Sequence, residues 1–234
     1  MNLWVIIIAL NAILSAILMS RVQKKKKRML LLSIAFLLLI YKITEYTIYG
    51  LNLEIGKIPI EFSTLSYFLF GITILFHIKT FYPVAAFASF ISGIGYLIAF
   101  IFIGEQYVLV NGLYTTIVSF TSHFILFFGS ILLKSFFEIK KEHIKYILIY
   151  TVIYLIYVII VNSFVNLDNS FLFIQILLKA DILAYLMPSQ ATDGFAYFIY
   201  YFSIFMIYRL TLSIFYKIFK HHKRNQEAFD EYSI

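Results

Sequence analysis

His123 lies near the middle of an apolar run that extends from Gly112 to Leu133, and its side chain is the one best placed for chemistry. An ionisable group at the depth of a membrane span is costly and is usually there for binding or catalysis. Thr116 and Ser119 precede it at positions i−7 and i−4, so all three side chains share one helix face. This spacing predicts a functional site inside the membrane.

A second set of polar residues lies in two earlier apolar runs. Lys42 and Glu45 are spaced i, i+3 and can form an ion pair. Glu61 and Thr64 have the same spacing and share a face, with Ser63 turned away from it. We expect these groups to outline a polar pocket that opens toward the outside. Its lining residues would be Lys42, Glu45, Thr116, Ser119 and Asn162.

The chemistry that these residue types could support is ester cleavage. A serine or threonine hydroxyl needs an adjacent base before it can attack an acyl carbonyl. His123 could serve as that base for Ser63 or Thr64, and Glu61 could orient its ring. The alternative for the hydroxyls is purely structural, because serine and threonine in membrane helices often bond to helix carbonyls. The Lys42–Glu45 pair could likewise serve only to fix helix register.

Composition restricts the class of protein. Of 234 residues, 62% are hydrophobic and 13% are charged, whereas a soluble domain has about 25% charged residues. Only a membrane protein can accommodate so much apolar surface. The absence of cysteine excludes disulfides and thiolate chemistry. The sequence has no phosphate loop, no dinucleotide fingerprint and no metal-ligand spacing, so we expect no cofactor and no metal.

A helix needs about 20 apolar residues to cross a bilayer. Seven segments of the sequence are long enough. They predict an all-α polytopic membrane protein with a single domain over residues 1–220 and a cytoplasmic tail over 221–234. The predicted spans are residues 2–20, 29–50, 58–78, 80–103, 111–136, 144–164 and 194–218.

The basic residues of the connecting segments give the orientation. Fifteen lysines and arginines fall on one side of the predicted membrane, and only Lys57 and Lys179 fall on the other. Because lysine and arginine accumulate in cytoplasmic loops, the N-terminus is predicted to be outside and the C-terminus cytoplasmic, in a multi-pass protein of the plasma membrane. The net charge of +7 is then explained by the orientation of the chain in the membrane and by attraction to anionic lipid headgroups. We therefore expect no nucleic-acid partner.

The outer connection over residues 165–193 is long and partly apolar. Lys179 and Asp181 interrupt its apolar middle, which makes it too polar to span. We expect an interfacial or re-entrant helix there. It could act as a lid, or it could be a surface helix that only packs; the sequence leaves both open.

Three short stretches resemble YwaF-like bacterial integral membrane proteins. Residues 58–67 resemble the opening of a helix that typically reads Leu-Pro-Leu-His-Leu-Cys in that family. Residues 122–130 look like its Ser-His-Gly helix, and Val161-Asn162 with residues 169–173 resembles its Asn-rich outer segment.

This family is similar to eukaryotic membrane acyltransferases and androgen-induced lipid hydrolases, in which a Cys or Thr nucleophile works with a His on another helix. The resemblance implies that His123 matches that His. Ser63 falls at the family's cysteine position and Glu61 at its histidine position, while a shifted register favours Thr64. Phe124 replaces the family's glycine.

Three functions therefore remain open. The protein could be a lipid acyl hydrolase or acyltransferase, a small-solute transporter or binding protein, or a non-catalytic membrane assembly factor. Membrane lipids are the expected partners, with a small molecule or an acyl lipid as the possible substrate. The sequence leaves the oligomeric state open.

Overall fold

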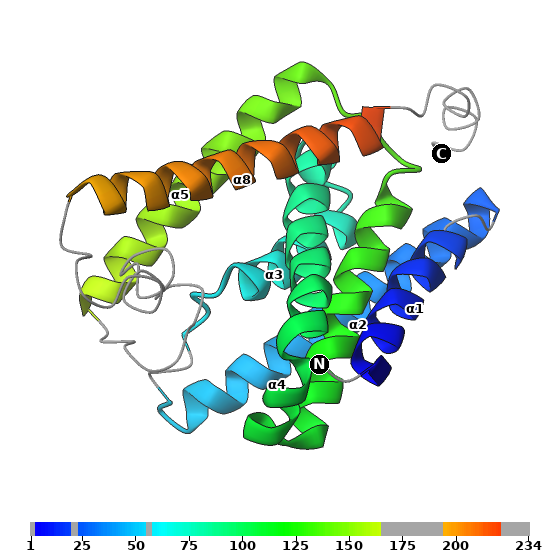
Figure 1. The fold of residues 1–234 in the computed structure, drawn as a ribbon. Coiled ribbons are helices and arrows are strands. Elements are labelled where there is room, and N and C mark those ends of the chain that lie inside the picture. Colours follow the sequence, from blue (N-terminus) through cyan, green and yellow to red (C-terminus); the bar gives the residue numbers. More distant parts are fainter. Residues whose placement is uncertain (1–2, 20–22, 55–57, 165–193, 221–234) are drawn as a thin grey trace.

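The computed structural model describes residues 3–19, 23–54, 58–164 and 194–220, and these ranges contain helices and turns but no strand (Figure 1). The predicted all-α class is confirmed. The elements are α1 (Leu3–Met19), α2 (Lys24–Leu51), α3 (Phe62–Leu75), the short 3-10 helix η2 (Lys79–Phe81), α4 (Tyr82–Leu133), α5 (Lys141–Phe164) and α8 (Gly194–Lys220).

Four helical segments within these ranges are long and apolar enough to cross a membrane: Lys25–Leu51, Lys79–Leu133, Lys141–Val161 and Phe198–Lys220. Helices α1 and α3 are apolar but shorter, with 17 and 14 residues. By length and composition, these helices are compatible with a membrane protein. The count of seven spans and the orientation stay predictions.

The longest helix, α4, reverses direction within its length. The spans predicted at 80–103 and 111–136 both fall within this element, and residues 104–110 between them are helical. The backbone leaves helical geometry at Gly112, where φ is 79° and ψ is 162°. L-residues with a Cβ rarely adopt this conformation. Polar residues such as Glu105 are good helix formers, so their presence between two apolar runs does not end the helix.

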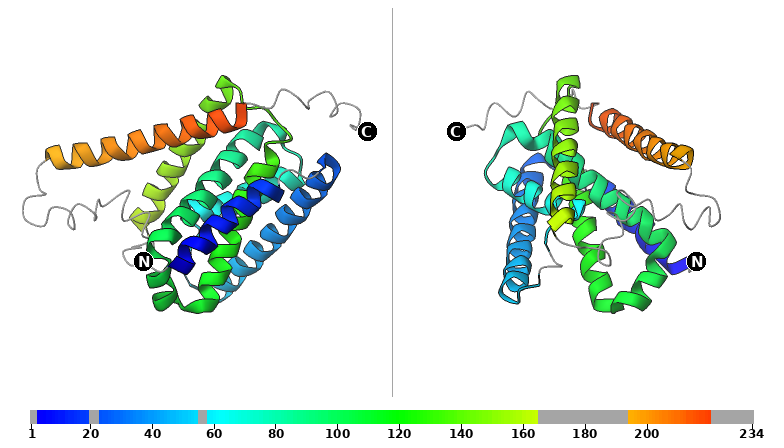
Figure 2. Two further views of the ribbon diagram at one scale, coloured as in Figure 1. Left: turned by 45° about the vertical axis from the view of Figure 1, so that its right-hand side comes forward. Right: turned by 90° about the vertical axis from the view of Figure 1, so that its left-hand side faces the viewer.

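The two arms of α4, residues 82–111 and 113–133, lie antiparallel (Figure 2). Tyr96 of the first arm stacks on His123 of the second. Nearer the open end of the hairpin, the Ser130 hydroxyl donates a hydrogen bond of 2.9 Å to the Ala86 carbonyl. The reversal at Gly112 therefore determines which residues face His123.

Other helix boundaries differ from the predicted spans by a few residues. Helices α2 and α5 begin at Lys24 and Lys141, before the predicted starts at 29 and 144, while α4 ends at Leu133 rather than 136. Apolar runs mark the part of a helix that suits the hydrocarbon, but charged residues can extend a helix beyond it.

The main apolar core forms where α2, α3, both arms of α4 and α8 meet. Phe87 of α4 contacts Phe215 of α8, with ring centroids 5.3 Å apart. Helix α8 crosses the bundle at a steep angle to α4 (Figures 1 and 2). Many large apolar side chains on the outer faces of the helices remain exposed, as expected for surfaces in contact with lipid.

Small residues allow the α4 arms to approach closely. A Cβ at Gly93 would lie 2.5 Å from the Phe127 backbone nitrogen, whereas one at Gly95 would meet nothing within 4 Å. Close helix contacts at small residues are typical of membrane bundles.

Gly93→Ala should therefore destabilise the fold, because backbone at Phe127 cannot move aside as a side chain could. Overpacking of this kind costs about 1–3 kcal/mol. Thermal unfolding of the purified protein measures the effect. Gly95→Ala is the matched control on the same helix, and it should be neutral or stabilising by up to about 1 kcal/mol. Equal effects of the two substitutions would contradict this account of the arm packing.

Candidate functional site

His123 is half-buried on the second arm of α4 and interacts, among the described residues, with Ser119, Tyr67 and Tyr96. Its Nδ1 lies 2.8 Å from the backbone oxygen of Ser119 and 3.3 Å from the Tyr67 hydroxyl of α3. The ring of Tyr96 stacks on the imidazole, with centroids 4.0 Å apart and planes 13° from parallel. Two tyrosines and one backbone carbonyl thus fix the ring.

The bond to Ser119 defines the chemical state of the histidine. A carbonyl oxygen can only accept a hydrogen bond, so Nδ1 carries the proton in the neutral ring. Nε2 is then the unprotonated nitrogen, and the hydrogen bonds of His123 within the described residues are both made by Nδ1. This arrangement presents Nε2 as an acceptor or general base.

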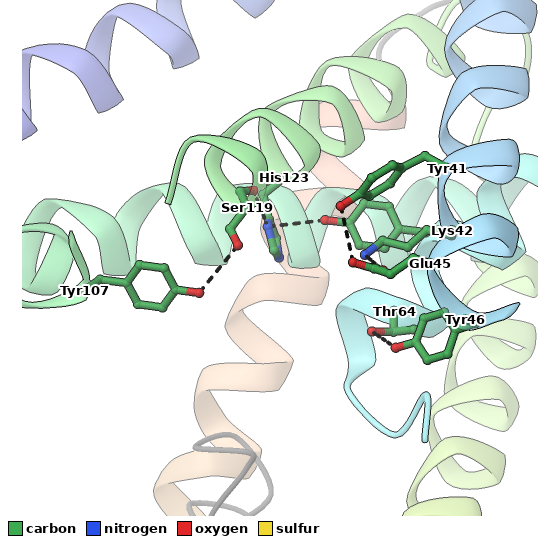
Figure 3. A network of polar contacts seen from close by, with 9 residues as sticks. Tyr41, Lys42, Glu45, Tyr46, Thr64, Tyr107, Ser119 and His123 are labelled. Atoms are coloured by element: carbon green, nitrogen blue, oxygen red, sulfur yellow. Dashed lines mark hydrogen bonds and ion pairs between the residues drawn. The ribbon is translucent and has the colours of Figure 1, made fainter. Parts of the chain in front are cut away.

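Tyr67 connects the histidine to an ion pair on α2. The Lys42 ammonium lies 4.7 Å from the centroid of the buried Tyr67 ring, within the range of a cation–π interaction. Lys42 pairs with Glu45, and the Tyr41 hydroxyl donates to the Glu45 carboxylate at 3.2 Å (Figure 3). The contacts form a series from α2 through α3 to α4.

The predicted pairing of Lys42 with Glu45 is confirmed. The two side chains are only 12% and 21% exposed, so the pair lies largely inside the bundle. Glu61 is elsewhere: it precedes α3 as the N-cap residue without a side-chain capping bond, and it lies near Tyr46 and Tyr154.

The predicted nucleophiles have other neighbours. Thr64 is buried, and its hydroxyl is 3.3 Å from the Tyr46 hydroxyl, which donates to it. Ser63 is half-buried beside it. Because the hydrogen bonds of His123 lead to Ser119 and Tyr67, pairing of His123 with either hydroxyl stays a prediction.

The remaining predicted residues fall into two groups. The Thr116 hydroxyl donates to the Gly112 carbonyl at 2.8 Å, and the Ser119 hydroxyl lies 3.4 Å from that of Tyr107 (Figure 3). Both thus serve the hairpin of α4 that carries His123. The Asn162 side chain, the connection over 165–193 and the tail over 221–234 lie outside the described residues.

Tyr67 and Tyr96 are the site residues that sequence reasoning missed. Both lie in apolar runs rich in aromatic residues, where tyrosine does not stand out. For Tyr67, a usable signal was the cost of burying a phenol hydroxyl, which normally requires a polar partner. That signal does not point to Tyr96, which contacts His123 through its ring.

Known proteins provide no further guidance to this site. No family model, no curated protein and no solved structure matches the chain. The resemblance to YwaF-like proteins therefore stays a prediction. Within the described ranges, no three His, Asp or Glu side chains gather in a way that could hold a metal ion.

Removal of one member of the Lys42–Glu45 pair should cost more stability than removal of both. Lys42→Met leaves a carboxylate and Glu45→Gln leaves an ammonium, each without its partner in a low-dielectric interior. Breaking such a pair costs about 3–5 kcal/mol when it is fully buried, and less here because some exposure remains. The double variant should recover part of that loss.

The measurement is a double-mutant cycle on the free energy of unfolding in detergent. The exposed pair Lys140–Glu142, with both side chains 67% exposed, provides the control. Additive effects at Lys42 and Glu45 would contradict a coupled intramembrane pair.

Proposed function

We propose that this chain is a seven-span protein of the cell membrane that binds a small polar solute within its helix bundle, in the manner of a transporter or solute receptor. The observation that carries the proposal is the contact series Glu45–Lys42–Tyr67–His123 across three helices. Purely structural ionisable groups are rare at such positions because each is costly to hold there.

The series offers complementary groups to a polar ligand. Nε2 of His123 is an acceptor, the Lys42 ammonium is a donor, and Glu45 is an acceptor. Lys42 and Glu45 neutralise one another, so a zwitterionic or neutral polar solute could exchange its own groups for theirs without leaving a net charge.

A second candidate function is cleavage of lipid acyl esters, and one observation favours it. The bond from Nδ1 to the Ser119 carbonyl orients His123 so that Nε2 can take a proton. Ser63 or Thr64 would then be the nucleophile, which requires movement because Thr64 now accepts a bond from Tyr46.

One experiment separates these functions. The purified protein in nanodiscs is tested for thermal stabilisation by a panel of amino acids, nucleosides, sugars and carboxylic acids. A ligand at a hundredfold excess over its Kd should stabilise the wild type by about 3 kcal/mol, and His123→Ala should abolish that gain. Tyr114→Phe, at a residue 82% exposed, is the control and should retain it.

Release of free fatty acid from the nanodisc lipids is measured in parallel. If no solute stabilises the wild type but lipid turnover depends on His123, the hydrolase is correct and solute binding is wrong. If neither signal exists, the remaining hypothesis is a non-catalytic assembly factor.

The orientation proposed here has the N-terminus outside, and it rests on the distribution of lysine and arginine. The chain has no cysteine, so an introduced cysteine is its only thiol. A membrane-impermeant maleimide should label Lys57→Cys in intact cells, but Lys26→Cys and Lys141→Cys only after permeabilisation. Labelling of all three in intact cells would contradict the orientation.

A further inference from the structure

Helix α1 has an asparagine at its centre. Asn11 is the middle residue of the 17 in this helix, and Ser15 is the other polar one. The helix packs against α4 on one side, where Val5, Ala9 and Ala16 are buried (Figure 2). Asn11 lies about 120–160° around the helix from these three residues, at about 100° per residue, and its side chain is exposed.

The carboxamide of Asn11 has hydrogen-bonding capacity that its own chain does not use. A carboxamide has two N–H donors and one acceptor oxygen. One N–H donates to the Ile7 carbonyl one turn earlier, at 2.8 Å, and this is the hydrogen bond that the Asn11 side chain makes within the described ranges. Its oxygen and its second N–H are therefore left without a partner there. In hydrocarbon no water supplies the missing bonds, so both groups are costly to leave unpaired.

The position of Asn11 prevents it from reaching the lipid head groups. At 1.5 Å per residue, it lies about 12 Å from either end of α1. An asparagine side chain is too short to cover that distance, unlike the long lysine and arginine side chains that extend to the interface. A partner for Asn11 must therefore come from another helix in the membrane.

The surface on both sides of Asn11 suits contact with a helix. Trp4 and Leu18 stand seven residues before and after it and are 44% and 51% exposed. A seven-residue spacing places all three on one stripe of the helix. Ser15, one turn after Asn11, is also exposed, and a small residue there lets a second helix approach closely. We call Trp4, Asn11, Ser15 and Leu18 the Asn11 stripe.

We infer that the Asn11 stripe is the surface through which two copies of this chain associate in the membrane, with the two Asn11 side chains bonded to each other. Copies inserted with the same orientation have parallel α1 helices, and a two-fold axis places the same residue opposite itself. A carboxamide is complementary to itself, so the unused N–H of each copy donates to the unused oxygen of the other. Buried asparagine pairs define parallel dimers in coiled coils in the same way.

An apolar helix of another protein would leave the unused groups of Asn11 unpaired, whereas a second copy satisfies both. The inference rests on the membrane location given under the proposed function, but it does not depend on solute binding at His123.

Energy transfer between copies in lipid vesicles measures the association. The chain has no cysteine, so Lys141→Cys provides a single position for a donor or an acceptor dye. We expect saturable energy transfer that falls as the protein is diluted with lipid. Asn11→Leu should weaken the association about tenfold, because it removes the hydrogen bonds between the helices.

Two substitutions serve as controls. Asn11→Gln keeps the carboxamide and should retain most of the association. Asn111 of α4 is also exposed, and its amide also donates to the carbonyl four residues earlier, at 3.1 Å. It lies at the reversal of α4 rather than on α1, so Asn111→Leu should leave the association unchanged. Thermal unfolding of each variant excludes loss of the fold as the cause.

Disulfide formation tests the geometry of the contact. Trp4→Cys and Leu18→Cys, which lie on the Asn11 stripe, should cross-link two copies rapidly on oxidation. Leu3→Cys and Ile17→Cys are at nearly the same depths but about 100° around the helix, and should cross-link at least about tenfold more slowly. The original side chains at these two control positions are 70% and 42% exposed, so burial within one copy does not protect them.

The absence of energy transfer in the wild type overturns the inference, and so does equal transfer for the wild type and Asn11→Leu. Equal cross-linking rates on and off the stripe also overturn it. Failure of the proposed function gives different results. His123 lies on α4 and its printed contacts are with α3 and α4, so His123→Ala should leave the association intact. The maleimide labelling described above tests the membrane location separately.

Discussion

The antiparallel pairing of the two arms of α4 is the constraint on which the rest of the structure depends. Only a residue without a Cβ adopts the backbone angles of Gly112 easily, and the reversal there sets the register of the arms. That register stacks Tyr96 on His123 and allows Ser130 to reach the Ala86 carbonyl. Helices α1, α2, α3 and α8 then pack around this hairpin.

The bundle satisfies its buried hydroxyls mostly with backbone carbonyls. Thr116 and Thr151 bond to the carbonyl four residues earlier in their own helices, whereas Ser66 also reaches Ser92 on α4 at 2.8 Å. In a low-dielectric interior such bonds avoid the cost of an unpaired polar group. The bond between Tyr67 and His123, like that between Ser66 and Ser92, instead joins side chains of different helices.

Contacts that depend only on the spacing of residues within one helix could be predicted from the sequence. Lys42 and Glu45 pair because helix geometry puts i and i+3 on one face, and Thr116 bonds within its own turn for the same reason. The all-helical class followed from the length of the apolar runs. These features need no knowledge of how the helices are arranged.

Contacts between helices could not be predicted in this way. The contact between Tyr67 and His123 depends on the rotation of α3 against α4 and on the register set at Gly112. Neither the rotation nor the register can be read from a largely apolar sequence.

Helix α2 makes two side-chain contacts with α3 that lie close together. Lys42 and Tyr46 are one helical turn apart, and Lys42 contacts Tyr67 while Tyr46 bonds to Thr64. A rotation of α2 that moves one of these side chains also moves the other, so the two contacts with α3 change together. Such coupling is reciprocal, so α2 transmits a change at the Lys42–Tyr67 contact to the Tyr46–Thr64 bond and a change at that bond to Lys42.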